Sequence, residues 1–382
     1  MYSVQKTKDI NFFKEFDYIL FFSVLLLSII GVIVLDSATH MEEPAVHARY
    51  MKVQIFSIAL GVIAALVICI IDYKYYLKTF GFILYAGCVG LLVVVLFKGV
   101  GENWGSKSWL RAPFIGSFQP SEIAKIAFII CGSIFLERLK ENQKDRVKNI
   151  IKYFVFSIIP IALIFKQPDY GMVVAYLVII ICMLFIYGIK YKYIFLTMGA
   201  VLATTPFIWF FALNDKRKAR IIEFIKPGTD KLNSGWQLSR AQMAIGSGQI
   251  FGSGLYKGMQ TQNDGVPVKE SDFIFAVIGE ELGFIGAMVV LILIFCILLR
   301  CIYIARNSRD LFGSYMVIGI TAMLGFQFFQ NIGMCVRLVP VTGIPLPFVS
   351  AGGSAMVTNY IAIGIALSVS VRKKKAIFNS NK

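Results

Sequence analysis

The segment VPVKESDFIFAVIGEELGFIG, residues 266–286, places four carboxylates beside a strongly apolar stretch: Glu270, Asp272, Glu280 and Glu281. The 382 residues include only 22 Asp and Glu and two His, so acid–base chemistry falls to carboxylates. Asp272 precedes Phe273 and Phe275, and apolar rings with Glu270 nearby would raise its pKa. We predict Asp272 as a general base, although an Asp before an apolar run also suits a helix N-cap.

Glu280 and Glu281 have a lesser predicted role. The apolar run that follows them ends at Arg300, which places both carboxylates at the membrane boundary. Adjacent residues on a helix point about 100° apart. We therefore expect at most one of the two to face a cavity with Asp272, and the other to pair with a cation.

A second candidate is QPSEIAK, residues 119–125. Ser121 suits the N-cap of a helix, and Glu122 suits the positive end of its dipole. Glu122 and Lys125 are three residues apart and can pair. A well-capped helix would explain all of this. However, Lys125 lies one turn inside an apolar stretch, where ionisable side chains usually serve a function.

Two further connections combine polar residues with residues that break helices. Asp169, in KQPDYG, is a candidate site residue in a pattern that also fits a plain tight turn. The segment PVTGIPLPF, residues 340–348, contains three prolines, so we predict a broken or re-entrant segment. In the SAGGS that follows, Gly352 and Gly353 allow close backbone approach or a nest for anionic oxygens.

Cations and possible metal ligands form the remaining chemical groups. Four cations directly follow an apolar span, and we predict that they contact lipid headgroups or a pyrophosphate, unless they form an amphipathic helix on the membrane: Lys216, Arg217, Lys218 and Arg220. His40 and His47 lie beside Glu42 and Glu43, in a pattern that fits a solvated loop better than a metal site. The seven Cys include no CxxC and fit small hydrophobic residues.

The elements that must position these residues are membrane spans. The chain is 57% hydrophobic and 16% charged, whereas soluble domains contain about 25% charged residues. We predict an all-α polytopic membrane protein that forms one domain over residues 1–382. Apolar windows long enough to cross a bilayer predict about ten transmembrane helices, near 17–35, 52–71, 76–97, 120–136, 151–166, 171–189, 193–213, 280–300, 311–331 and 347–371.

The distribution of cations predicts the orientation. With both termini inside, the inner segments carry 21 of the 38 Lys and Arg, so the positive-inside rule explains most of the net charge of +16 without nucleic acid. Residues 1–16 are then a cytoplasmic N-terminal tail, 372–382 a basic cytoplasmic tail, and 214–272 a long extracytoplasmic loop between spans seven and eight. The unusual polar connections all fall on the outer side, which predicts one convergent site there.

Five ordered motifs resemble the SEDS proteins (shape, elongation, division and sporulation), polytopic enzymes that polymerise bacterial cell-wall glycan. The resemblance extends from the first span to about residue 371. TGIPLPF and QPDYG are more similar to the elongation branch, RodA, than to the division branch, FtsW. The motifs are GSKSWL…QPSEIAK, QPDYG, GWQLSRAQMAIGSGQIFGSGL, ESDFIFAVIGEELG and NIGMCVRLVPVTGIPLPFVSAGGS.

The resemblance implies ten spans in the bacterial cytoplasmic membrane, with both termini cytoplasmic. It implies transfer of a glycan carried on undecaprenyl pyrophosphate onto the 4-hydroxyl of lipid II, for cell elongation and rod shape. Asp272 is then the essential residue, and Glu122, Lys125 and Trp109 line the same cavity. The implied partners are a class B penicillin-binding protein and other membrane proteins of the elongation complex. No nucleotide is needed, and whether a divalent cation assists the reaction stays open.

The sequence departs from the family pattern at three places. Glu270 and Ser271 stand where His-Thr is frequent, Arg337 where glycine is usual, and Ala351 where an aromatic residue is common. Arg337 could bind pyrophosphate or only mark a divergent subfamily. The full set of candidate substrate-binding residues is Trp109, Gln119, Ser121, Glu122, Lys125, Asp169, Arg220, Asn331, Arg337, Ser350, Gly352, Gly353 and Ser354.

Two other functions compete with a glycosyltransferase. A flippase for lipid-linked precursor should place polar groups through the full depth of the bilayer. The inner halves of the predicted spans, in contrast, carry few polar groups. A non-catalytic scaffold for a penicillin-binding protein would not need Asp272, Glu122 and Lys125 together. The sequence therefore favours the enzyme.

Overall fold

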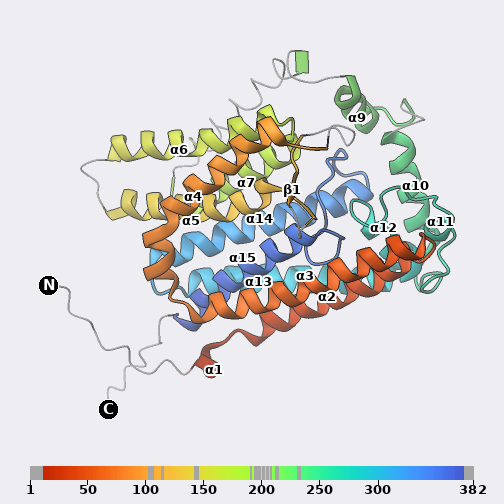
Figure 1. Ribbon diagram of the computed structural model, residues 1–382, viewed down its shortest axis with the longest axis horizontal. Helices are drawn as coiled ribbons and strands as arrows, with labels where there is room; N and C mark the ends of the chain where they lie inside the picture. Colours follow the sequence, from red (N-terminus) through yellow and green to blue (C-terminus); the bar gives the residue numbers. More distant parts are fainter. Residues whose placement is uncertain are drawn as a thin grey trace.

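The computed structural model describes residues 12–101, 107–112, 116–141, 146–189, 215–229 and 234–373, with a few isolated residues between 192 and 210. The described helices lie side by side in one bundle (Figure 1). The long helices are α2 (Tyr18–Thr39), α3 (Pro44–Ile70), α4 (Tyr73–Lys98), α5 (Pro120–Glu141), α6 (Arg146–Lys166), α7 (Tyr170–Tyr187), α13 (Gly283–Arg306), α14 (Leu311–Cys335) and α15 (Gly353–Val371).

The short elements define the two ends of the bundle. Helix α1 (Phe12–Glu15) lies near the end of α15, where Lys373 pairs with Glu15; we call this end the terminal face. Four short helices lie at the other end, the loop face: α9 (Asp215–Ile225), α10 (Ser234–Ser247), α11 (Met259–Gln262) and α12 (Ile274–Glu281) (Figure 1). Strands β1 (Leu110–Ala112) and β2 (Gly116–Phe118) form an antiparallel hairpin between α4 and α5.

Within the described residues, eight helices are long and apolar enough to cross a bilayer: α2, α3, α4, α6, α7, α13, α14 and α15. The prediction of an all-α, multi-pass membrane protein is therefore confirmed. Helix α5 coincides with a ninth predicted span, but its charged residues make it too polar to qualify by composition. The tenth prediction, 193–213, lies almost entirely outside the described residues.

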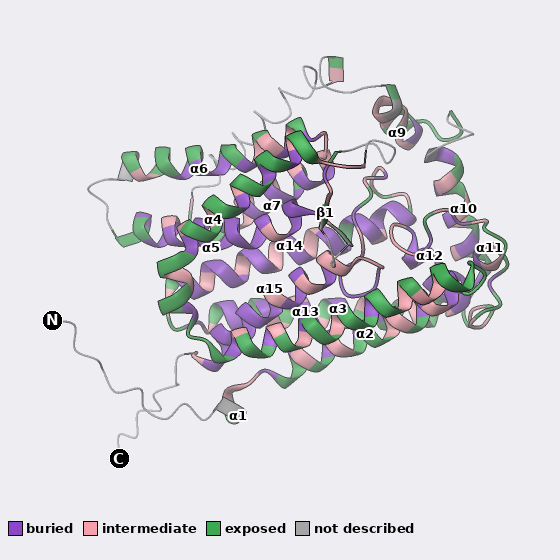
Figure 2. Cartoon of the chain, in the orientation of Figure 1, coloured by how far each residue is buried: buried purple, intermediate pink, exposed green. Residues whose placement is uncertain are grey.

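Helix α5 is tolerated because it lies inside the bundle. Figure 2 shows α5, α14 and α15 largely buried, while α4 and α6 present exposed faces. Small residues allow the inner helices to approach closely. A Cβ atom on Gly364 of α15 would lie 2.7 Å from the Cα of Ala65 on α3. Large exposed apolar side chains, such as Phe56 and Ile83, suit contact with lipid.

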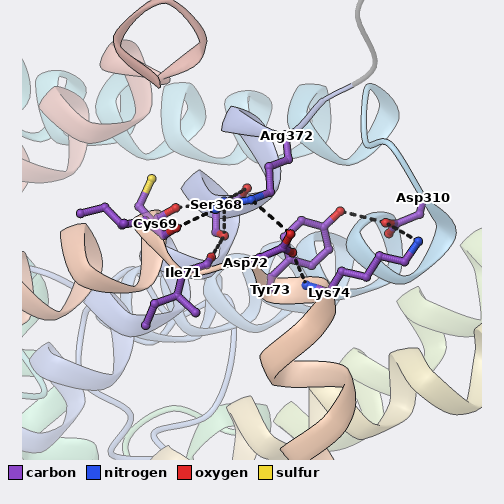
Figure 3. Close-up of polar contacts among 9 residues, drawn as sticks. Cys69, Ile71, Asp72, Tyr73, Lys74, Asp310, Ser368 and Arg372 are labelled. Carbon is purple, nitrogen blue, oxygen red and sulfur yellow. Dashed lines mark hydrogen bonds and ion pairs between the residues drawn. The ribbon is translucent and has the colours of Figure 1, made fainter. Parts of the chain in front are cut away.

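The terminal face is tied together by one polar network (Figure 3). The Arg372 guanidinium donates hydrogen bonds to the carbonyl oxygens of Cys69 and Ile70, the last residues of α3, at 3.0 and 2.7 Å. Ser368 donates to the Ile71 carbonyl. The Tyr73 hydroxyl donates to Asp310, the N-cap of α14. These bonds satisfy carbonyls left open at a helix end and join α3, α4, α14 and α15.

The proline-rich segment between α14 and α15 is irregular and buried, as predicted. Side chains satisfy its backbone: Gln330 donates to the Pro340 carbonyl and Asn331 to the Ile344 carbonyl, both at 2.9 Å. Irregular backbone survives at membrane depth when protein groups satisfy it. The last predicted span was wrong at its start, because these prolines delay the helix from residue 347 to Gly353.

Candidate active site

Asp272 lies in the turn before α12, and the turn's backbone is fixed by the segment around the start of α15. Asn331 on α14 donates a hydrogen bond to the Asp272 carbonyl at 2.9 Å. Ser350 donates through its hydroxyl to the Ser271 carbonyl at 2.6 Å, and the Ala351 amide donates to the Glu270 carbonyl at 2.8 Å. Three consecutive carbonyls are therefore held, which fixes where the Asp272 side chain begins.

The Asp272 carboxylate is not a helix cap, so that alternative is wrong. Phe273 occupies the N-cap position of α12, and no side chain caps this helix. Oδ1 accepts a hydrogen bond from Ser271 at 3.2 Å, and within the described residues no donor lies in bonding range of Oδ2. Burial, reinforced by Glu270 and opposed by Ser271 and Arg220, raises the pKa of Asp272 to about 6.

Gly343 forms the wall beside this free oxygen. Its φ is 75°, a left-handed conformation that favours glycine, and a Cβ atom at this position would lie 3.4 Å from Asp272 Oδ2. Any side chain here would be strained and would occupy the space beside the carboxylate. Gly343 was not predicted as a site residue, although a glycine in the middle of TGIPLPF is a signal that could have found it.

A second polar cluster lies at the start of α5 and α7. Lys125 is wholly buried and donates to Glu122 Oε1 at 3.0 Å, as predicted, while Glu122 Oε2 has no hydrogen-bond partner among the described residues. Gln119 donates to Asp169 Oδ2 at 2.8 Å, and Asp169 caps α7 through the Met172 amide. Burial raises the pKa of Asp169 to about 6.

Ser121 does not cap α5, so that expectation was wrong. The helix begins one residue earlier, at Pro120, and proline suits a first helical position because it needs no amide partner. The Ser121 hydroxyl is buried and has no hydrogen-bond partner among the described residues. Its carbonyl accepts a hydrogen bond from Tyr176.

The two clusters meet through the proline-rich segment. A Cβ atom on Gly171, two residues after Asp169, would lie 3.3 Å from atoms of Thr342 and Ile344. These two residues flank Gly343, which contacts the space beside Asp272. The start of α7, which Asp169 caps, and the Asp272 carboxylate therefore both lie beside this short segment. The Thr342 hydroxyl is buried without a hydrogen-bond partner in the described part of the chain.

Helix α9 adds cations to this region. Arg220 is exposed and lies near enough to Asp272 to lower the pKa of that carboxyl. Arg217 donates to the Pro168 carbonyl at 3.0 Å and stacks over Tyr170. These two predicted cations therefore face the site; the side chain of Lys216 lies outside the described residues.

Arg337 pairs with a residue of α9, which leaves its binding of pyrophosphate untested. Its guanidinium donates to both the carbonyl and the Oε1 of Glu223 on α9, at 2.9 and 3.1 Å. Glu223 was not predicted as a functional residue, because an acidic residue among basic neighbours on an amphipathic helix gives no sequence signal. The departure from the family pattern thus creates an ion pair between the turn after α14 and α9.

Glu280 and Glu281 are both buried, and the expectation that one pairs with a cation was wrong. Glu280 accepts hydrogen bonds from the Gln260 and Thr261 amides and the Thr261 hydroxyl, at 2.6–2.9 Å. Glu281 accepts from Ser37 and Gln262. Neutral donors satisfy both carboxylates, which fasten α11 and α2 to α12.

The other predicted residues have weaker links to the site. Gly352, Gly353 and Ser354 begin α15 and are partly exposed, and Gly353 allows close approach to Ser57 of α3. The Trp109 backbone pairs with Val100 beside the hairpin. That the Trp109 side chain lines the cavity stays a prediction. Within the described ranges, no three potential ligands from His, Cys, Asp and Glu lie close enough together to hold a metal ion.

The comparison with family models decides the family. Residues 17–375 match the FtsW/RodA/SpoVE model, which is described as "Cell cycle protein". The chain belongs to this family. The prediction of a SEDS protein is confirmed, and the match covers every long helix described above.

Curated relatives and solved structures extend the match. The chain is 34% identical to a "Probable peptidoglycan glycosyltransferase FtsW" from Geobacter metallireducens, covering 94% of this chain and 96% of that protein. It is 32% identical to "Peptidoglycan glycosyltransferase MrdB" from Escherichia coli K12, covering 92% and 93%. The predicted enzyme class therefore agrees with these relatives, whereas similar identity to FtsW and MrdB leaves the elongation branch a prediction.

Two solved structures share the fold. One, titled "Structural coordination of polymerization and crosslinking by a peptidoglycan synthase complex", matches with a TM-score of 0.78 and 25% identity over 93% of this chain and 97% of that chain. The Thermus thermophilus rod shape determining protein RodA matches with a TM-score of 0.69 and 24% identity over 94% and 98%. The SEDS fold is therefore shown over nearly the whole chain.

Proposed function

We propose that this chain is a peptidoglycan glycosyltransferase that joins lipid II into glycan strands for cell elongation, with Asp272 as the general base. The observation that supports it most is the state of Asp272. Its backbone is fixed, one carboxylate oxygen is free among the described residues, and its pKa is raised to about 6. A base with this pKa is ionised at neutral pH yet binds a proton strongly enough to assist transfer.

The acceptor is the 4-hydroxyl of lipid II, and a sugar hydroxyl is a poor nucleophile. As its oxygen attacks the anomeric carbon of the donor glycan, Asp272 takes the hydroxyl proton. The new glycosidic bond forms while the bond from the anomeric carbon to the pyrophosphate oxygen breaks. The free oxygen of Asp272 and the space left by Gly343 are where the acceptor would bind.

The leaving group is undecaprenyl pyrophosphate, which needs a counter-charge more than a proton. Arg220 faces Asp272 from α9 and would stabilise the charge that grows on the pyrophosphate. Lys125 is less available for this role, because it is wholly buried and already pairs with Glu122. The Glu122–Lys125 pair instead supports the start of α5, from which Gln119 holds Asp169.

Orientation and partners belong to the same proposal. We place the loop face outside the bacterial cytoplasmic membrane and both termini in the cytoplasm, because the positive-inside rule favours this orientation. A solved relative acts in a complex that coordinates polymerisation with crosslinking. A class B penicillin-binding protein is accordingly the proposed partner, together with other membrane proteins of the elongation complex.

The direct test is polymer formation from purified lipid II in proteoliposomes, by this chain alone and with a class B penicillin-binding protein. We expect glycan strands and release of undecaprenyl pyrophosphate. A parallel assay with fluorescent lipid II in the inner leaflet measures translocation. Translocation without polymer would establish the flippase instead, and neither activity with stable binding to the penicillin-binding protein would establish the scaffold.

A further inference from the structure

Helix α9 carries the cation that faces Asp272, yet the described helices offer it little packing. Apart from its neighbour α10, no described helix packs extensively against α9. Its position therefore depends on polar contacts made by individual side chains. Three of its residues, Arg217, Arg220 and Glu223, follow one another at three-residue spacing and share one broad face of the helix.

The outer two of these residues anchor the helix, and the middle one, Arg220, has no hydrogen bond or ion pair with another described residue. Arg217 donates to the Pro168 carbonyl at 3.0 Å, beside Asp169. At the other end, the buried Glu223 accepts from Arg337 at 3.1 Å. Arg220 lies between these anchors and is exposed. Anchoring on both sides directs Arg220 toward the space at Asp272.

Arg337 has features that a purely stabilising residue would lack. Its φ of 62° is a left-handed conformation that is uncommon for any residue except glycine, asparagine or aspartate. Its Nε is buried and has no hydrogen-bond partner among the described residues. Such local strain persists where the surrounding structure enforces it and is concentrated at functional positions. Glycine would fit this backbone better, but it could not reach Glu223.

We propose that the Arg337–Glu223 ion pair is a positioning latch, which holds α9 so that Arg220 faces Asp272. The inference rests on the proposed function, because it assigns Arg337 an indirect role in glycosyl transfer. Arg337 acts through α9 and is a positioning residue. Binding of pyrophosphate falls to Arg220, which the latch leaves exposed.

Loss of the latch should change the pH dependence of the polymerisation rate. The charged groups that shift the pKa of Asp272 are Glu270 on its own turn and Arg220 on α9, with Arg217 acting on Arg220. The Cys335 thiol of α14 also faces this turn and donates to the Asp272 carbonyl at 3.9 Å. Arg220 lowers the pKa of Asp272. If α9 moves away, that pKa rises, and the acidic limb of the rate profile moves to higher pH. The loss of rate is then larger at pH 6 than at pH 8.

The experiment compares Arg337→Gln, Glu223→Gln and the double variant in the lipid II polymerisation assay. Misplacement of a catalytic region by about 1 Å can cost about 10²-fold, so we expect kcat/KM to fall roughly 10–100-fold in each single variant. Two residues that act through one contact are non-additive, so the double variant should fall no further. Lys226→Gln, which removes an exposed charge next to α9, is the matched control and should retain the wild-type rate.

Two further measurements separate positioning from folding. Arg337→Gly relieves the backbone strain, which offsets part of the stability lost with the Glu223 ion pair. It should therefore lose as much rate as Arg337→Gln with a smaller loss of thermal stability. Hydrogen exchange of residues 215–229 should increase in the Arg337 variants, while exchange in α14 and α15 stays unchanged. A wild-type rate for Arg337→Gln, or an equal loss at pH 6 and pH 8, would overturn the latch. Full activity of Asp272→Asn would instead refute the proposed function, and hydrogen exchange would still report on the latch.

Discussion

The two ends of the helix bundle use charge in opposite ways. At the terminal face, charged groups pair and cap helices. Arg300 forms a two-pronged ion pair with the buried Asp17 at 2.6 and 3.2 Å, and Asp17 also caps α2. Arg372 closes the end of α3 (Figure 3). Each of these charges has a partner that explains it.

At the loop face, the charges nearest the site are incompletely matched. Asp272 has a free oxygen, Glu122 Oε2 is buried without a partner, and Asp169 receives only neutral donors in the described part of the structure. The pKa values of Asp272 and Asp169 are both raised to about 6. Strongly perturbed carboxyl groups of this kind are concentrated at functional sites.

The difference between the two faces distinguishes charges that stabilise the fold from charges that serve a reaction. Paired charges lower the free energy of the folded state, whereas carboxylates held with raised pKa values raise it and persist because they serve a function. It also bears on the flippase alternative. A polar path through the bilayer would need open polar groups at both ends, but the terminal face presents ion pairs that bind its helices together.

The largest expected effect on stability comes from breaking the buried pair on α5. Lys125→Met leaves Glu122 buried without a counter-charge, which should destabilise the protein by about 3–5 kcal/mol. The double variant Glu122→Gln/Lys125→Met removes both charges and should recover most of this loss in a thermal melt. Equal melting temperatures for the single and double variants would show that the pair is not the source of the effect.

A smaller effect is expected at the terminal face. Arg372→Gln removes charge-assisted hydrogen bonds to the end of α3. One such bond is worth about 1.5–3 kcal/mol, and the partial exposure of Arg372 keeps their sum below the cost of breaking the buried pair on α5. We expect a lower melting temperature and an unchanged rate of polymerisation per folded molecule. Lys74→Gln is a suitable control, since its exposed pair with Asp310 should contribute about 1 kcal/mol or less. A large loss of specific rate in Arg372→Gln would contradict the division between the two faces.

The smallest change tests the wall of the site. Gly343→Ala forces a Cβ atom into a left-handed backbone position and to 3.4 Å from Asp272 Oδ2. We expect about 1 kcal/mol of destabilisation and a lower rate from crowding of the acceptor. Gly188→Ala has a similar φ, of 95°, and open space around its Cβ, so it should show the destabilisation alone. Equal rates in the two variants would exclude crowding.

The pH dependence distinguishes the two perturbed carboxyl groups. A general base must be ionised, so kcat/KM should fall as the pH decreases through about 6. If Asp272 is the base, Asp169→Asn lowers or preserves the rate but leaves this acidic limb in place. Disappearance of the limb in Asp169→Asn would assign the titration to Asp169.

The sequence was sufficient for most of the architecture because apolar spans are long and regular. It placed nine long helices and the interruption by the prolines at 340, 345 and 347, since length and proline chemistry determine both. It missed the exact polar partners. Ser121 did not become a cap, because Pro120 can begin the helix one residue earlier.

Long-range contacts limited prediction of the site. One of Glu280 and Glu281 was expected to pair with a cation, yet both bind neutral donors from residues 37 and 260–262, which no local pattern predicts. The inner halves of the spans were also predicted to be plain, which was wrong in part, because the buried Glu137 pairs with Lys78 there. The pairing of Arg337 with Glu223 spans 114 residues and required the structure.

The most direct test is the rate and stability of Asp272→Asn beside Arg372→Gln. A general base contributes about 10²–10⁴-fold, so Asp272→Asn should lose that much polymerisation rate per folded molecule. Its melting temperature at neutral pH should equal or exceed that of the wild type, because the raised pKa shows that the ionised carboxylate is disfavoured. Arg372→Gln should show the reverse, a wild-type rate with lower stability. A wild-type rate for Asp272→Asn would contradict the account.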